Sequence, residues 1–208
     1  MMTYLLTGIF AIIILVLCSF YFIKQSRLPS GFIGRKMMRL WNRIYLPMVK
    51  WSLNEIDASF SPSSILDVGV GNGASTNLLY GLYKPNSIYG IDISKTAIEE
   101  AKNIYQSDSI SFELMNINHL SFKDDMFDFV TIFQTHFHWK NLEASLVEIK
   151  RVLVPDGKVV MACETDKINI YTPEYKNEED FRKLLDKLGF KNFVYKTYNK
   201  WSAYYFKK

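Results

Sequence analysis

After residue 63, short apolar segments alternate with helical patterns, which predicts an α/β fold whose mostly parallel sheet is covered by helices on both faces. Two further observations complete the prediction. A run of uncharged residues near the N-terminus predicts one transmembrane helix ahead of the sheet, and two aromatic-rich segments at the C-terminus predict a closing antiparallel hairpin. The chain therefore divides into three predicted parts, residues 1–28, 29–60 and 61–208.

The composition predicts one folded domain of ordinary size with an appendage. Of the 208 residues, 49% are apolar and 15% aromatic, so the chain can bury a substantial core. Seven basic residues and no acid lie between Lys24 and Lys50, whereas the rest of the chain carries 18 basic and 21 acidic residues. This mildly acidic body argues against a broad nucleic-acid interface. Cys18 and Cys163, without a CxxC pattern, predict neither a disulfide framework nor a metal site.

The segment from Tyr4 to Ile23 predicts a membrane anchor. Its 20 residues carry no charged side chain, and a helix of that length spans roughly 30 Å, the hydrocarbon thickness of a bilayer. A secretory signal peptide fits less well, because no basic residue precedes the run and no A-x-A-like site follows it. The basic residues after the span place the N-terminus outside and the remainder in the cytoplasm.

Residues 29–60 predict a helical linker or lid. Pro47 divides the pattern into two short helices, since proline interrupts a helix interior. An apolar stripe at helical spacing predicts packing against the domain, with a place in the membrane interface as the alternative. The stripe consists of Met37, Leu40, Trp41 and Ile44.

Within the predicted domain, strands and helices alternate from Ser64 on. Its first five predicted strands are Ile65–Val68, Ile88–Ile91, Ser111–Leu114, Phe127–Phe133 and Lys158–Cys163. The predicted helices between them are Ser75–Tyr83, Lys95–Tyr105 and Leu142–Leu153, and no clear helix links the third and fourth strands. Ser94 and Asn141 are the expected N-caps of the second and third helices.

The C-terminal part follows a different pattern. Asn177 is the expected N-cap of a helix that Gly189 ends. Two strands then follow, joined by a short turn around Asn199 and Lys200, and these form the closing hairpin.

The stretch between the first strand and its helix predicts a ligand site. Gly69, Gly71 and Gly73 lie at alternate positions, which favours a sharp turn and a close approach of backbone to a ligand. The pattern nearly fits a dinucleotide site, with Asp92 about 20 residues further on. Asp67 favours another ligand, because a carboxylate aimed at the turn would repel a diphosphate and suit the ammonium and sulfonium of S-adenosylmethionine.

These motifs resemble those of class I S-adenosylmethionine-dependent methyltransferases. The stretch DVGVGNG from Asp67 is similar to the family's D/E-x-G-x-G-x-G motif, and IYGIDIS to its second-strand motif. The stretch LSFKDDMFDFV is similar to the segment before strand four, EIKRVLVPDGKVVM to the segment entering strand five, and LLDKLGF to the helix before the hairpin. The resemblance covers about residues 29–208 and implies a Rossmann-like sheet of seven strands in the order 3-2-1-4-5-7-6.

The resemblance also implies which residues bind the cofactor S-adenosylmethionine. Asp67 and the three glycines would line its methionine half, and Asp92 would hold the ribose hydroxyls. The remaining expected contacts are Ile93 on the adenine face, Asn116 and Ile117 at the adenine edge, and Gln134 near the transferable methyl. Asn116 stands where the family usually has Asp, and Asp156 replaces a turn glycine.

Methyl transfer requires a base only when the acceptor must lose a proton. His136 and His138, just after the fourth predicted strand, are the candidate bases, because an extended segment would put both imidazoles on one side. His136 is the one expected to face the substrate; His138 is assigned a structural role and His119 a loop position. Cys163 is expected in the core, which argues against cytosine C5 chemistry.

The predicted activity is methyl transfer to a small or lipid-like acceptor, since an anchor concentrates an enzyme near membrane-dissolved substrates. Two alternatives stay open: a non-catalytic membrane-anchored module that keeps the fold, and an NAD-dependent oxidoreductase. The oligomeric state is left open.

Overall fold

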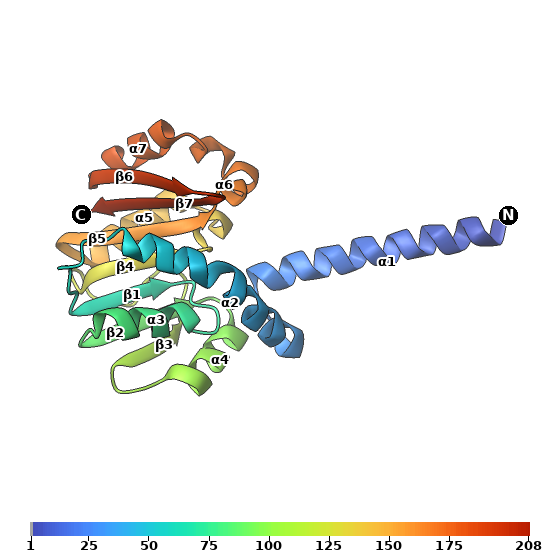
Figure 1. Ribbon diagram of the computed structural model, residues 1–208, viewed down its shortest axis with the longest axis horizontal. Coiled ribbons are helices and arrows are strands. Elements are labelled where there is room, and N and C mark those ends of the chain that lie inside the picture. The colour runs from blue at the N-terminus through green and yellow to red at the C-terminus, as the bar shows by residue number, and fades with distance from the viewer. Residues whose placement is uncertain (1) are drawn as a thin grey trace.

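The computed structural model describes residues 2–208, with side chains from Gly8 onward, and contains a seven-stranded sheet with helices on both faces (Figure 1). The strands are β1 Ser64–Val68, β2 Ser87–Asp92, β3 Ile110–Leu114, β4 Phe127–Phe133, β5 Leu153–Glu164, β6 Lys191–Tyr198 and β7 Trp201–Lys207. The α-helices are α1 Met2–Arg27, α2 Gly31–Asn54, α3 Ala74–Tyr83, α4 Lys95–Tyr105, α5 Leu142–Val152, α6 Thr165–Tyr171 and α7 Glu178–Lys187. Two short 3-10 helices complete the described elements, η1 His136–His138 and η2 Pro173–Tyr175.

The strand order is β3-β2-β1-β4-β5-β7-β6, which confirms the predicted fold class. The five strands β3, β2, β1, β4 and β5 each pair in parallel with the next in this order, and β7 runs antiparallel to both β5 and β6. The chain moves outward from β1 to β3 and then returns to place β4 beside β1. Ligands of open α/β sheets bind at such a switch point, beyond the carboxyl ends of the strands.

The two faces of the sheet bury separate cores because side chains alternate along each strand. In β1, Ile65 faces the core under α2, α3 and α4, whereas Leu66 and Val68 face the core under α5 and α7. Cys163 is fully buried in the second core, as expected from the sequence.

The expected caps are partly confirmed. Ser94 accepts a hydrogen bond from the Ala97 amide, and Asn141 accepts one from the Ala144 amide. Asn177 precedes α7 without such a bond and donates instead to Asp180. Asp156 has a φ of 60°, so it occupies the left-handed conformation usually left to glycine.

The prediction of two helices divided at Pro47 is wrong. A single helix, α2, runs from Gly31 to Asn54 with Pro47 inside it. Beyond the proline, Met48, Val49 and Leu53 are buried under the sheet. Their burial offsets the lost backbone hydrogen bond and keeps the helix continuous.

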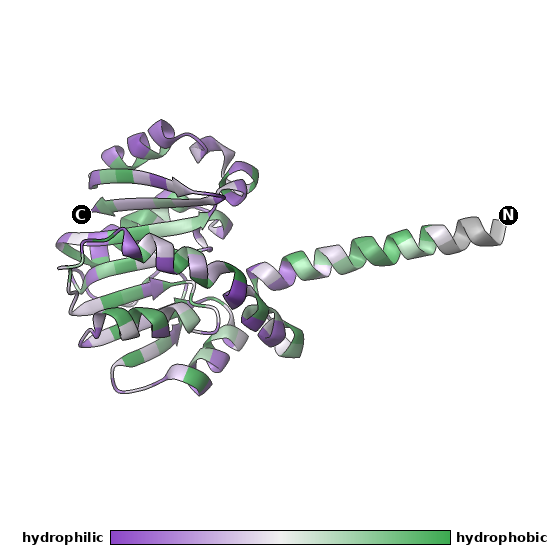
Figure 2. Cartoon of the chain, in the orientation of Figure 1, coloured by the Kyte–Doolittle hydropathy of each residue, from purple (hydrophilic) through white to green (hydrophobic). Residues whose placement is uncertain are grey.

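Helix α1 extends away from the domain, and its residues from Gly8 to Ile23 are mostly hydrophobic (Figures 1 and 2). Its stretch from Gly8 to Arg27 is long and apolar enough to cross a membrane, judged by length and composition alone. The anchor predicted for residues 4–23 falls inside α1, so its helical form is confirmed, while its insertion in a bilayer stays a prediction.

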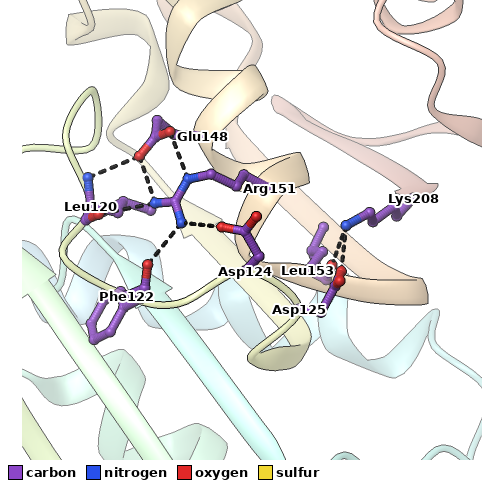
Figure 3. A network of polar contacts seen from close by, with 8 residues as sticks. All are labelled: Leu120, Phe122, Asp124, Asp125, Glu148, Arg151, Leu153 and Lys208. Atoms are coloured by element: carbon purple, nitrogen blue, oxygen red, sulfur yellow. Dashed lines mark hydrogen bonds and ion pairs between the residues drawn. The ribbon is translucent and has the colours of Figure 1, made fainter.

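A polar network holds the segment before β4 in place (Figure 3). The Arg151 guanidinium donates to the carbonyls of Leu120 and Phe122 at 2.9 and 2.8 Å and to the carboxylates of Glu148 and Asp124. Glu148 in turn accepts from the Leu120 amide at 3.0 Å. These contacts explain the E-x-x-R spacing in α5, since residues three apart share one helix face.

Candidate functional site

The glycine turn bends the chain from β1 into α3 at the switch point. All three glycines have positive φ, between 55° and 82°. A Cβ on Gly69 would lie 2.5 Å from the Thr135 side chain, and one on Gly73 would lie 2.8 Å from Phe112. Gly69 and Gly71 line a cleft, as expected, whereas Gly73 packs against the core and supports the turn from below.

Asp67 lies beneath this turn and does not line the cleft. Its side chain is buried, with 1% exposed. It accepts hydrogen bonds from the hydroxyls of Ser75, Thr76 and Thr131 at 2.7–2.8 Å. Burial raises the pKa of Asp67, and these hydrogen bonds oppose that shift. The expectation that its carboxylate faces the ligand is therefore corrected, because strand alternation turns it under α2 and α3.

Asp92 takes the position at the turn that Asp67 was expected to hold. It ends β2, lines the cleft, and accepts from the Gly71 amide at 2.9 Å and the Ser94 amide at 2.8 Å. Burial raises its pKa, and these amide contacts oppose the shift. A protein carboxylate already occupies the turn amide, so a diphosphate bound there would be repelled. This arrangement favours a ligand without phosphate and leaves carboxylate lone pairs for hydroxyl groups.

The cleft has two adjoining lobes that share Asp92 and Gly69. The first lies over the carboxyl ends of β2 and β3 and includes the expected residues Ile93, Asn116 and Ile117. Ile93 is largely exposed, Ile117 is buried, and the Asn116 side-chain oxygen accepts from the Asn118 amide at 3.0 Å. This lobe therefore combines apolar side chains, which can contact the face of a purine base, with amide groups that can form hydrogen bonds to its edge.

The second lobe lies between α2 and the carboxyl ends of β1 and β4. Gln134 lines it as expected, with a φ of 56° and its side-chain oxygen 3.4 Å from the Glu164 amide. Met38, Trp41 and Tyr45 form its α2 wall. Of the predicted apolar stripe, Trp41 and Ile44 line this lobe. Leu40, Trp41 and Ile44 are exposed, so the predicted packing of the stripe against the domain is not observed.

The assignment of His136 as the base is contradicted by its burial. Its side chain is 3% exposed and lines neither lobe, and its Nε2 lies 3.6 Å from the Cys163 sulfur. Its Nδ1 finds no hydrogen-bond partner among the residues whose side chains are described. Burial lowers the pKa of His136 to about 3, so the ring is neutral.

His138 lines both lobes and so occupies the position expected for His136. The segment is a 3-10 helix rather than an extended strand, and residues two apart on it point in different directions. Burial, with the nearby cations Arg27 and Lys167, lowers the pKa of His138 to about 4. A neutral imidazole in the cleft can accept a proton.

Arg27, Lys167 and Tyr171 are among the cleft residues that were not identified from the sequence. Arg27, at the end of α1, lines both lobes and donates to the His138 carbonyl at 3.3 Å. Lys167 and Tyr171 belong to α6, and the Tyr171 ring stacks on Phe137 at 5.7 Å between centroids. The seven residues of α6 are too few for a helical period to predict them.

Helix α2 is fastened over the turn by polar contacts. Arg39 donates to the buried Glu100 carboxylate at 2.6 and 3.0 Å, and Asn42 donates to Asn72 at 3.1 Å. These contacts therefore hold α2 in place over the glycine turn, so that α2 covers the cleft on the side opposite the strand ends.

Comparison with known proteins gives consistent results. Residues 66–161 match a family described as methyltransferase domain. The chain is 30% identical over 156 residues to the O-methyltransferase cnsE of Penicillium expansum, covering 66% of this chain and 56% of that protein. It is 30% identical over 96 residues to the ubiquinone/menaquinone biosynthesis C-methyltransferase UbiE of Desulfotalea psychrophila, covering 46% of this chain and 39% of that protein. The chain thus spans about half the length of these relatives, or less.

A solved structure of an S-adenosylmethionine-dependent methyltransferase from Aquifex aeolicus has the same fold. The TM-score is 0.64 at 18% identity, over 76% of this chain and 88% of that one. At this identity the likeness establishes the fold of the chain.

Proposed function

We propose that this protein is a class I S-adenosylmethionine-dependent methyltransferase that methylates a small, apolar or lipid-like acceptor at the cytoplasmic face of a membrane. Residues 66–161, which match a methyltransferase domain family, support this proposal. The observation that carries the proposal is the two-lobed cleft with Asp92 where the lobes meet. One lobe suits a nucleoside, and the other is walled by aromatic side chains.

The residues of the cleft fit S-adenosylmethionine. Asp92 would accept from the ribose hydroxyls, Ile93 and Ile117 would contact the adenine, and Asn116 would bond to its edge. The bare backbone of Gly69 and Gly71 leaves room for the methionine half, with Gln134 at the boundary to the second lobe. Asp67 acts through the turn that it supports.

The second lobe favours a flat apolar acceptor. Trp41 and Tyr45 of α2 face it from one side, and Phe137 and Tyr171 from the other. Aromatic walls favour planar, weakly polar groups. The names of the relatives, an O-methyltransferase and a ubiquinone/menaquinone C-methyltransferase, agree with such an acceptor.

In this mechanism the sulfonium of S-adenosylmethionine supplies an activated methyl group. The aromatic side chains of the second lobe align the acceptor with that methyl group. The same side chains, with α2 above them, exclude water. His138 is neutral and lies in the cleft, so it can accept the acceptor's proton; its lowered pKa makes it a weak base, which suits an acceptor that is itself acidic. Arg27 and Lys167 lower the cost of negative charge on the acceptor as that proton leaves.

The proposed location rests on α1 and the basic residues that follow it. The positive-inside rule places Lys24 and the domain on the cytoplasmic side. An acceptor dissolved in that bilayer would be concentrated at the cleft.

The proposal is tested by incubating the full chain in lipid nanodiscs with S-adenosylmethionine tritiated in its methyl group, together with either a lipid extract or the aqueous fraction of the same cells. We expect label to enter the organic phase with the lipid extract. Label in aqueous products alone would contradict the lipid-like acceptor, and no transfer to either would favour a non-catalytic module.

A further inference from the structure

Exposed apolar side chains lie on both sides of the cleft mouth. At the start of α2, Phe32 is 62% exposed and Ile33 43%; at the end of α6, Ile170 is 68% exposed and Tyr171 44%. Single exposed apolar residues are common on proteins, but these four flank one opening. Met38 and Trp41 line the cleft on the α2 side, and Tyr171 lines it on the α6 side.

The first turns of α2 and helix α6 lie on the side of the domain from which α1 extends (Figure 1). Helix α6 follows the carboxyl end of β5, and the first turns of α2 follow α1 directly. The carboxyl ends of the parallel strands, where the cleft opens, therefore face the same way as the predicted anchor.

The junction between α1 and the domain is held by polar contacts. Gln25 is buried and exchanges hydrogen bonds with Ser30, through its oxygen at 2.8 Å and its nitrogen at 2.9 Å. Pro29 accepts from the Ser94 hydroxyl at 2.6 Å. Because these contacts fix the direction of α1, inserting α1 in a bilayer also fixes which surface of the domain meets it.

The charges around the cleft mouth suit an anionic lipid surface. Residues 1–54 contain no acid. Lys36 lies 4.5 Å above the Phe32 ring, and Lys167 lies 5.9 Å from the Tyr171 ring. Lysine beside exposed aromatic and aliphatic groups is the composition of segments that lie at a membrane interface.

We propose that the first turns of α2 and the end of α6 form a second bilayer contact, in which Phe32, Ile33 and Ile170 enter the headgroup region of an anionic membrane. The cleft then opens between them onto lipid, and an acceptor reaches it without crossing water. This inference rests on the proposed membrane location and adds the orientation of the domain on the membrane.

The test uses the full chain with Cys18→Ser, in vesicles of phosphatidylcholine with a minor fraction of phosphatidylglycerol. An environment-sensitive fluorophore is attached at Phe32→Cys, Ile33→Cys or Ile170→Cys; the buried Cys163 is inaccessible to it. Leu82→Cys is the matched control, since Leu82 is 54% exposed but lies at the end of α3, just before β2 begins, near the amino ends of the parallel strands and away from the cleft mouth. Binding of S-adenosylhomocysteine by each labelled chain confirms that it is folded.

We expect blue-shifted emission and quenching by spin-labelled lipid at residues 32, 33 and 170, and neither at residue 82. The contrary result would be emission typical of a water-exposed fluorophore at all four positions, in a chain that resists alkaline extraction from the vesicles. It would overturn the second contact and leave the anchor intact. Release of the chain by alkali would overturn both this contact and the proposed membrane location, while methyl transfer could still be measured.

Discussion

Asp67 stabilises the glycine turn through three hydroxyl groups. Replacing it by asparagine turns one acceptor oxygen into a donor that faces hydroxyls already donating. We expect Asp67→Asn to lower the free energy of unfolding by about 1–3 kcal/mol, the cost of unsatisfied buried polar groups. Urea denaturation measures this loss. Unchanged stability with lost cofactor affinity would instead restore a direct contact between Asp67 and the ligand.

His138 should matter for turnover rather than for cofactor binding. A general base contributes about 10²–10⁴-fold in rate. We expect His138→Gln to reduce turnover of an acceptor that loses a proton by at least about tenfold, with S-adenosylhomocysteine affinity retained. The matched change at the buried neighbour, His136→Gln, removes no group from the cleft. Equal turnover by the His138 variant and the native chain would exclude the proposed base.

His136 should make stability depend on pH. Its pKa is about 3 in the folded chain and near 6.5 when unfolded, so the unfolded chain binds the extra proton as the pH falls below 6.5. Stability is therefore lost toward acid, by at most about 1.4 kcal/mol per pH unit for this group. Melting temperatures at pH 7 and pH 5 should show a smaller drop in His136→Gln than in the native chain. Identical drops would contradict a buried neutral His136.

Some residues of the site could be predicted from the local sequence. The glycine turn and Asp92 follow from strand-to-helix patterns, and the structure places Gly69, Gly71 and Asp92 at the cleft. The directions of Asp67 and His136 were not predictable in the same way. The first depends on which face of β1 is turned to α3, and the second on a 3-10 helix that tertiary packing selects.

Among the elements, α5 is linked to the segment before β4 by the hydrogen bonds and ion pairs of Arg151. Arg151 makes five donor contacts that lysine cannot reproduce, because lysine lacks the planar fork of donors. We expect Arg151→Lys to lower the free energy of unfolding by about 1–3 kcal/mol. The matched control Arg182→Lys, at a half-exposed pair with Glu178, should cost less than about 1 kcal/mol. Equal losses in the two variants would contradict the role of the network.

Most elements were predictable because their periods are clear. Five strands, three central helices and the hairpin turn lie within a few residues of their predicted bounds, apart from the earlier start of β5 at Leu153, and the link before β4 carries no helix. The two failures have physical reasons. Packing of Met48 and Val49 keeps α2 continuous through Pro47, and α6 is too short to show a period.

In the whole molecule, helix α1 and the sheet domain are not independent parts. Arg27 ends α1 and lines the cleft, and Gln25 and Pro29 fasten the junction to the domain. The division at residue 28 predicted from composition therefore passes through the site. A chain shortened to residues 29–208 would lose Arg27, a cation of the cleft, together with helix α1.

We infer that the cleft binds a nucleoside donor without phosphate through Asp92. The most direct test is calorimetric titration of the full chain in nanodiscs with S-adenosylhomocysteine and with NAD, for the native chain, Asp92→Ala and the exposed control Asp108→Ala. We predict binding of S-adenosylhomocysteine alone, weakened at least about tenfold by Asp92→Ala, or about 1.4 kcal/mol, and unchanged by Asp108→Ala. Binding of NAD, or S-adenosylhomocysteine affinity that does not depend on Asp92, would contradict the account.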